Sequence, residues 1–109
     1  MNPIEKEAFQ NAVYDIVQLI PVGRATSYGA IAKAIGFSNL SRMVGKAMSQ
    51  CPADIPAHRV VNSQGVLSAN DAFGIFGKMQ QRLEAENVTV QNNRIQNWKI
   101  IFWDPMKEL

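Results

Sequence analysis

The sequence has only one cysteine and one histidine among its 109 residues, Cys51 and His58. A single cysteine excludes an intramolecular disulfide, and one cysteine with one histidine cannot supply the four ligands of a structural zinc site. The chain also lacks an apolar run near the ~20 residues that span a bilayer, and its N-terminus lacks a signal-peptide pattern. We therefore expect a cytoplasmic protein with no membrane segment, no metal site and no cofactor.

Acidic side chains are scarce in the middle of the chain. Residues 21–64 contain five cationic side chains and the single acid Asp54, a net charge of +4 in a chain whose total is +2. Such a local excess suits a polyanionic partner such as nucleic acid, and an ordinary solvated face is the alternative. The length, with 47% hydrophobic residues, predicts one domain over residues 1–109. The five cations are Arg24, Lys33, Arg42, Lys46 and Arg59.

Apolar residues recur every three or four positions from residue 4 to residue 20. This spacing predicts one face of an amphipathic helix, which ends before Pro21 because proline cannot continue it. The residues expected to face inward are Ile4, Phe9, Ala12, Val13, Ile16, Val17 and Ile20.

Two shorter helices are predicted close together after this break. The first covers residues 28–35, follows two hydroxyl residues that can cap it, and is closed by Gly36. The second follows a cap at Ser38 or Asn39. Two short helices joined by a tight glycine-containing turn are typical of a helix-turn-helix, although plain core packing produces the same pattern.

The second short helix has polar residues on its outward face. Arg42 and Lys46 are expected to point away from the core, and Gly45 lies in the helix interior. Glycine there costs about 0.5–1 kcal/mol relative to alanine, so its presence indicates close approach of another backbone or partner.

The second half of the chain predicts a small hairpin and a further helix. The hairpin pairs residues 60–62 with 66–68 around a turn at Gln64-Gly65, and the helix covers residues 71–86. Residues 88–102 predict a strand or hairpin. The fold class is therefore mainly α with a small β-hairpin or wing. Core residues expected in this half are Phe73, Phe76, Met79 or Gln80, Leu83, Trp98, Phe102 and Trp103.

The run Pro56-Ala57-His58-Arg59-Val60 has the layout of a reactive-cysteine site with a methyl group in place of the sulfur. A neighbouring imidazole and guanidinium would favour a thiolate at the second position. Ala57 has no proton to lose and no lone pair, so the run predicts a site that binds without reacting. Arg59 is expected to anchor the turn through backbone and carboxylate hydrogen bonds, with contact to DNA as the alternative.

Three motifs carry a resemblance to a known family. They are Thr26-Ser27-Tyr28-Gly29, the run from Ser41 to Met48, and the run from Ile55 to Val61. In their order and spacing, the chain from about Ile4 to Val88 resembles the C-terminal, DNA-binding domain of the O6-alkylguanine-DNA alkyltransferases, and more closely their alkyltransferase-like branch. The resemblance implies a winged helix-turn-helix domain.

The resemblance also implies a function. In the alkyltransferases the position of Ala57 holds the cysteine that accepts an alkyl group from O6 of guanine. An alanine there implies a non-enzymatic damage sensor, expected to be a monomer. It would bind duplex DNA containing O6-alkylguanine, flip the modified nucleotide, leave the alkyl group in place, and signal to nucleotide excision repair proteins. A small side chain at the pocket floor implies tolerance of bulky O6 substituents.

Several residues match positions with known roles in that family. Tyr28 and Arg42 match the side chains that rotate the nucleotide out and occupy its place, on a helix that enters the minor groove. His58 and Glu86 match the base and carboxylate that activate the family's cysteine, and together with Ala57 form a vestigial site. The implied DNA-binding residues are Tyr28, Ser41, Arg42, Gly45 and Lys46, and the implied alkylguanine pocket consists of Ala57, Arg59, Val60, Ser68 and Asn70.

Two departures from the family pattern leave questions open. Asn70 lies near where some alkyltransferase-like proteins have an arginine that senses the alkylated ring, and either Arg59 or Asn70 can take that role. Cys51 replaces an asparagine of the alkyltransferases, six residues before Ala57.

Two alternative functions follow from the same residues. One is an active alkyltransferase with Cys51 as nucleophile, although no motif puts His58 or a cation beside this thiol. The other is a winged helix-turn-helix regulator that reads sequence, although Arg42 and Lys46 stand nearly alone as long polar side chains on the second helix.

Overall fold

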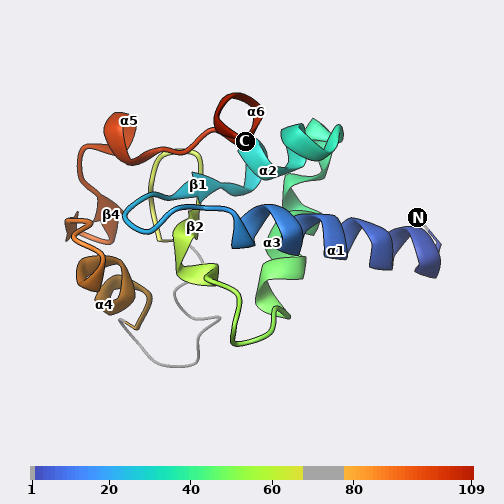
Figure 1. Ribbon diagram of the computed structural model, residues 1–109, viewed down its shortest axis with the longest axis horizontal. Coiled ribbons are helices and arrows are strands. Elements are labelled where there is room, and N and C mark those ends of the chain that lie inside the picture. Colours follow the sequence, from blue (N-terminus) through green and yellow to red (C-terminus); the bar gives the residue numbers. More distant parts are fainter. Residues whose placement is uncertain (1, 68–77) are drawn as a thin grey trace.

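The computed structural model describes residues 2–67 and 78–109, and Figure 1 shows how its elements are arranged. None of the helices within these two ranges has the length and apolar character that crossing a membrane requires. In chain order, the elements are α1 (Pro3–Gln18), β1 (Thr26–Ser27), α2 (Tyr28–Ile35), the 3₁₀ turn η1 (Ser38–Leu40), α3 (Ser41–Ser49), the 3₁₀ turn η2 (Ala57–Arg59), β2 (Val60–Val61), α4 (Lys78–Ala85), β3 (Val90–Gln91), β4 (Arg94–Ile95), α5 (Trp98–Ile101) and α6 (Pro105–Glu108).

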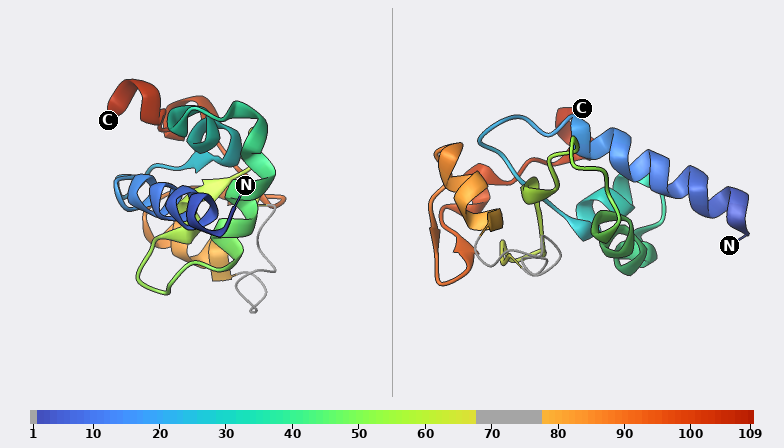
Figure 2. Two further views of the ribbon diagram at one scale, coloured as in Figure 1. Left: turned by 90° about the vertical axis from the view of Figure 1, so that its right-hand side faces the viewer. Right: turned by 90° about the horizontal axis from the view of Figure 1, so that it is seen from below.

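The first helix forms almost over its predicted range. The side chain of Asn2 caps α1 by accepting a 2.8 Å hydrogen bond from the backbone N–H of Glu5, and Pro3 occupies the first turn, where no donor is needed. The prediction for Ile4 was wrong, since it is 81% exposed. The N-terminal turns of α1 extend beyond the rest of the fold, so nothing covers that residue (Figure 2). The predicted inward residues Phe9, Val13, Val17 and Ile20 are buried.

The two short helices of the predicted helix-turn-helix are confirmed as α2 and α3, and they contact each other. Ser27 caps α2 by accepting a hydrogen bond from the N–H of Ala30, and Gly36 ends it with a φ of 101°. The predicted side-chain cap of the next helix was wrong. Residues 38–40 form η1 instead, and Leu40 precedes α3 without a side-chain cap.

The hairpin predicted after residue 59 is confirmed at its turn, where the N–H of Asn62 donates to the carbonyl of Val66 at 3.1 Å, but Val60 and Val61 pair with another strand. Gly65 has a φ of +80°, and Asn62 Oδ1 accepts hydrogen bonds from the N–H groups of Gln64 and Val66, as a tight turn requires. However, β2 pairs in parallel with β1, Thr26 opposite Val60, and Val66 bridges to Arg94. Ser68 lies outside the described residues.

The strand β2 lies where two hydrophobic clusters meet. Val60 packs into the cluster built by α1, α2 and α3, whereas its neighbour Val61 packs into the cluster built by α4, β3 and β4. Successive side chains of a strand point to opposite faces, so two residues serve both clusters. The 3₁₀ turn η2 immediately precedes β2 and is therefore held at this junction.

The C-terminal region is partly as predicted. Strands β3 and β4 form the expected antiparallel hairpin, but residues 98–101 form α5, which the sequence did not predict. Trp103 is buried in the α1–α3 cluster. Its N–H donates to the carbonyl of Ala25, and the N–H of Ala25 donates to the carbonyl of Ile101, so residues 101–103 are held against the chain before β1. Met79 and Leu83 face inward on α4. Phe73 and Phe76 lie outside the described residues.

The assigned α1–α3 cluster predicts that replacing a buried and an exposed isoleucine changes the free energy of unfolding by different amounts. Ile31 on α2 has no exposed surface, so Ile31→Ala should lower the free energy of unfolding by about 2–5 kcal/mol through lost burial and a cavity. Ile4→Ala makes the same chemical change at an exposed site and should stay within about 0.5 kcal/mol of wild type. Urea unfolding followed by circular dichroism compares them, and equal effects would contradict the assigned core.

Candidate functional site

The exposed face of α3 carries the polar residues singled out from the sequence. Arg42 and Lys46 are exposed, while Ser41 and Gly45 are half-buried beside them. Among residues 2–67 and 78–109, a Cβ added at Gly45 would meet no atom within 4 Å outside its neighbours and its own helix. The packing of these residues therefore does not require a glycine at this position of the helix.

Side-chain hydrogen bonds from α1 hold α3 in place. The Tyr14 hydroxyl donates a 2.7 Å hydrogen bond to the carbonyl of Ala47, and Gln10 Nε2 donates to the Tyr14 hydroxyl at 2.9 Å and to Gln50 Oε1 at 3.3 Å. The sequence analysis missed this contact. The only signal for it is the i, i+4 spacing of Gln10 and Tyr14, which puts both on one side of α1.

The cationic surface is smaller than the count over residues 21–64 predicted. Arg24 donates to the carbonyls of Ile101 and Phe102 and pairs with Glu108 at 3.1 Å, so it ties the C-terminal segment to the chain before β1. Arg59 is held inside the fold, as described below. The exposed cations of this region are Lys33, Arg42 and Lys46.

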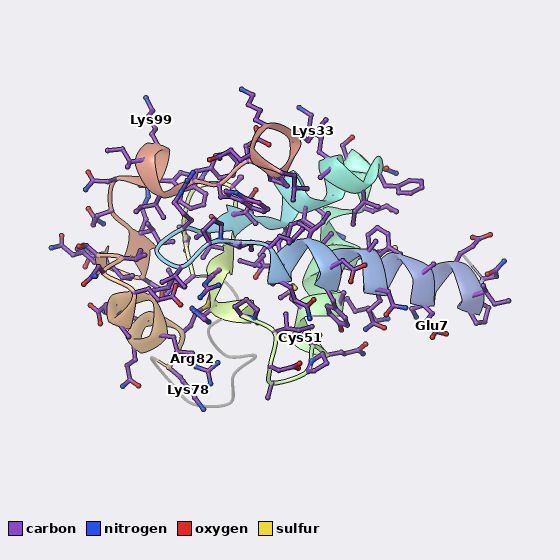
Figure 3. All side chains as sticks on the ribbon, in the orientation of Figure 1. Glu7, Lys33, Cys51, Lys78, Arg82 and Lys99 are labelled. Carbon is purple, nitrogen blue, oxygen red and sulfur yellow. The ribbon has the colours of Figure 1, made fainter. Side chains whose placement is uncertain are left out.

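The turn η2 presents Ala57 to a cavity of about 200 Å³. Ala57 is 9% exposed, and its N–H donates to the carbonyl of Ile55 at 2.7 Å, which tightens the turn after Pro56. The same cavity is lined by Cys51 from the segment after α3 and by Lys78 and Arg82 from α4. Figure 3 shows these three labelled side chains on the same side of the molecule.

The predicted vestigial groups His58 and Glu86 are in direct contact. His58 Nε2 lies 2.9 Å from Glu86 Oε2. Because the carboxylate accepts, Nε2 carries the proton, and Nδ1 is then a buried lone pair without a hydrogen-bond partner among the described residues. Arg59 donates from Nε and Nη2 to the same carboxylate, at 3.0 and 2.6 Å, and from Nη1 to the carbonyl of Ile20 at 2.8 Å. Arg59 thus anchors the turn, as expected.

This contact sets the charges of both residues. Burial of Glu86 favours its neutral form, but hydrogen bonds from Arg59, His58 and the N–H of Gly23 outweigh it and lower the pKa of Glu86 to about 2. Burial lowers the pKa of His58, and the charges of Arg59 and Arg82 add to that effect against the opposing pull of Glu86. Near neutral pH the pair is therefore a carboxylate and a neutral imidazole.

The thiol of Cys51 is not activated in this setting. Burial raises the pKa of Cys51, and the nearby charge of Asp54 raises it further. A thiol with a raised pKa is a poor nucleophile near neutral pH because little thiolate is present.

The structure brings together only part of the predicted pocket. Ala57 lines the cavity, whereas Val60 is buried in β2 and the guanidinium of Arg59 is turned toward Glu86 and Ile20. Ser68 and Asn70 lie outside the described residues. Sequence reasoning did not identify Lys78 and Arg82 as pocket residues. Their i, i+4 spacing predicts that they share one face of the helix, but it does not predict that this face lies next to Ala57.

Residues 8–88 match the model of the family described as 6-O-methylguanine DNA methyltransferase, DNA binding domain. The chain belongs to this family. The match covers the helix-turn-helix, the turn η2, and Glu86 in the segment directly after α4. The methyltransferase-family fold therefore accounts for the mainly helical architecture with a small sheet.

Within this methyltransferase family, similar proteins include alkyltransferase-like members. Alkyltransferase-like protein 1 of Schizosaccharomyces pombe is 33% identical over 105 residues, which cover 91% of this chain and 97% of that protein. The DNA base-flipping protein of Escherichia coli is 37% identical over 93 residues, which cover 83% of this chain and 70% of that protein.

Solved structures of this family include relatives of both kinds. The crystal structure of S. pombe Atl1 in complex with damaged DNA containing O6-carboxymethylguanine matches with a TM-score of 0.79 at 33% identity, covering 89% of this chain and 95% of that one. The O6-methylguanine methyltransferase of Mycobacterium tuberculosis matches with a TM-score of 0.63 at 35% identity, covering 72% of this chain and 47% of that one.

The contact between Glu86 and its partners predicts a pH-dependent stability. The folded-state pKa of Glu86 is lowered from 4.5 to about 2, so its contribution is complete above pH ~4.5 and is lost as the pH falls toward 2. Since one pKa unit corresponds to about 1.4 kcal/mol, that loss is roughly 3 kcal/mol. Glu86→Gln should lower the free energy of unfolding at pH 7 and flatten its fall between pH 5 and pH 2.

Urea unfolding at a series of pH values measures this effect. Glu84→Gln, at an exposed position of α4 two residues before Glu86, is the matched control and should keep the wild-type profile. A Glu86→Gln profile parallel to wild type would show that the contact does not stabilise the fold through ionisation.

Proposed function

We propose that this single-domain protein is a DNA damage sensor. It binds duplex DNA containing O6-alkylguanine, rotates the modified nucleotide out of the helix, leaves the alkyl group in place, and marks the lesion for nucleotide excision repair. The observation that carries the proposal is the turn η2, which presents the methyl group of Ala57 to the pocket although the His58–Glu86 contact beside it is intact. The pocket thus keeps the surroundings of a reaction centre without its nucleophile.

The face of α3 supports the DNA-binding part of the proposal. A planar guanidinium such as that of Arg42 can stack on bases and still donate hydrogen bonds, which suits a side chain that fills the place of an extruded nucleotide. Tyr28 begins α2 and would crowd the phosphate next to that nucleotide. Gly45, which the packing of the described residues does not require, would let the helix approach the floor of a groove. Ser41 and Lys46 flank it and would contact phosphates.

The relatives support the same assignment. Similar proteins include one crystallised with DNA that contains O6-carboxymethylguanine and others named for base flipping, and they match 83–91% of this chain. Flipping costs a few kcal/mol, and less where alkylation has weakened the base pair, so lesion selectivity follows from the mechanism. The proposal also includes that the protein binds as a monomer and that excision repair proteins then recognise the marked lesion.

The chemistry of the pocket disfavours alkyl transfer by Cys51. This thiol lines the same cavity as Ala57, which is the one observation in favour of a reaction. Its pKa is raised by burial and by Asp54, so little thiolate forms near neutral pH, and His58 is not among the described residues that line this cavity.

The proposal predicts lesion-selective binding without transfer. The purified protein is titrated with two identical duplexes, one with a single O6-methylguanine and one with guanine, and the lesion strand and the protein are then weighed by mass spectrometry. Tighter binding of the methylated duplex with the methyl group still on the DNA is expected. Methyl on the wild-type protein but not on a Cys51→Ser variant would establish a transferase, and equal affinities would favour a general DNA-binding protein or regulator.

A second prediction concerns Arg42. Because its side chain would occupy the space left by the flipped nucleotide, Arg42→Ala should lower the preference for the methylated duplex about tenfold or more, toward a ratio of one. Lys99→Ala removes an exposed positive charge from α5 and should leave that preference unchanged. Fluorescence anisotropy gives both ratios, and an unchanged ratio in Arg42→Ala would remove this residue from the flipping step.

A further inference from the structure

A groove with a volume of about 440 Å³ lies between α1 and α3. Its lining comes from residues 3–11, in α1, and from residues 43–50, in α3 and its C-terminal cap. The floor is apolar, since Phe9 and Ala47 are buried there and Met43 is half-buried. This groove shares no lining residue with the cavity at Ala57, so it is a separate feature of the surface.

The rim of the groove carries two cations from different helices. Lys6 belongs to α1 and Lys46 belongs to α3, and both side chains are exposed. The ion pairs within residues 2–67 and 78–109 involve neither of them. Glu7 is the one acid among the described lining residues, so the charge of the lining is two minus one, or +1. Lys6 lies outside the cationic stretch of residues 21–64, and only the packing of α1 against α3 brings it to Lys46.

Amide side chains add hydrogen-bond donors to this rim. Gln10 Nε2 donates to Gln50 Oε1 at 3.3 Å, which ties α1 to α3 across the groove. Gln50 takes part in this bond as an acceptor, so the bond does not use its own amide N–H groups. The exposed side chain of Asn11 lines the same groove. Ammonium and amide donors above an apolar floor suit an anion that carries an apolar part.

We propose that this groove holds one sugar–phosphate unit of the DNA that flanks the flipped nucleotide, with Lys6 and Lys46 in contact with its phosphate. The inference rests on the DNA-binding part of the proposed function, which puts the exposed face of α3 against the duplex. Lys46 belongs both to that face and to the groove, so a strand that follows α3 continues toward Lys6. The sugar is the apolar part that covers the floor, and the phosphate is the anion that meets the rim.

This contact strengthens binding without recognising the lesion. Phosphate contacts fix the position and register of a protein on the duplex but carry no information about the base. Lys6 therefore differs from Arg42, whose proposed role is to fill the space of the flipped nucleotide. Glu7 opposes the contact, because a carboxylate in the lining repels a phosphate.

The first test measures binding of a duplex with O6-methylguanine and of the same duplex with guanine over a series of salt concentrations. At low ionic strength, Lys6→Gln should weaken both complexes about two- to fivefold and leave their ratio unchanged. The slope of log K against log salt should fall by about 0.9, as expected for one lost phosphate contact. Glu7→Gln should strengthen both complexes.

Lys99→Gln is the matched control for these variants. Lys99 is an exposed lysine at the other end of the molecule from Glu7, so its replacement should keep the wild-type affinities and slope (Figure 3). Thermal unfolding checks that each variant is folded.

A second test locates the phosphate. Uncharged methylphosphonates replace the phosphates that flank the O6-methylguanine, one in each duplex. At the contacted position the replacement should weaken the wild-type complex about two- to fivefold and leave the Lys6→Gln complex unchanged, because the two changes remove the same interaction. At the other positions both proteins should lose affinity by the same factor.

The outcomes separate this inference from the proposed function. Wild-type affinity and slope in Lys6→Gln, with the preference for O6-methylguanine intact, would overturn the groove contact alone. A loss in Lys6→Gln that depends on no single phosphate would also overturn it, since such a loss reflects general attraction. Dependence on one phosphate together with equal affinity for both duplexes would support the groove contact and overturn lesion sensing. Absence of DNA binding in the wild-type protein would overturn both.

Discussion

The carboxylate of Glu86 joins three parts of the chain that are far apart in sequence. It accepts hydrogen bonds from the N–H of Gly23 after α1 and from His58 and Arg59 in η2, while it belongs to the segment after α4. Arg59 completes the connection through the carbonyl of Ile20. Removing one partner from a nearly buried ion pair leaves an uncompensated charge, at a cost of about 3–5 kcal/mol. The position of η2, and therefore of Ala57, depends on this carboxylate.

The intact network beside an inert Ala57 has a physical explanation. In a reactive site the His–Glu contact would orient a base, but here the same contact also fixes the turn between the two hydrophobic clusters. Val60 and Val61 follow η2 directly and belong to different clusters, so a disturbance of η2 would loosen both. His58, Arg59 and Glu86 therefore have a structural role that does not depend on any chemistry at Ala57.

Features set by neighbouring residues could be predicted from the sequence. The ranges of α1, α2 and α3 followed from apolar spacing, Pro21 and Gly36, and the turn at Gly65 followed from its glycine. The pairing of β1 with β2 could not be predicted, because it joins Thr26 to Val60 through two-residue strands that carry no periodic signal. The interior role of Arg24 was missed for a similar reason, since its acceptors are backbone carbonyls at residues 101 and 102.

For the candidate site, the sequence predicted which residues take part better than it predicted how they are arranged and exposed. The family resemblance implied that His58 and Glu86 are partners, and the structure places them in contact. The same motif could not show that Lys78 and Arg82 reach the cavity, because the packing of α4 against η2 decides this. Charge counting over residues 21–64 overestimated the cationic surface, since a sequence does not distinguish an arginine that anchors the fold from one that faces solvent.

The hydrogen bond from Tyr14 to the carbonyl of Ala47 has a mechanical consequence. It ties α3 to the sixteen-residue helix α1, so a load applied to α3 is passed into α1 instead of tilting α3 alone. In the proposed complex, the protein would therefore deform little when it binds. The distortion needed to bring the two surfaces together would fall on the duplex, whose bending and unstacking would carry the elastic energy of binding.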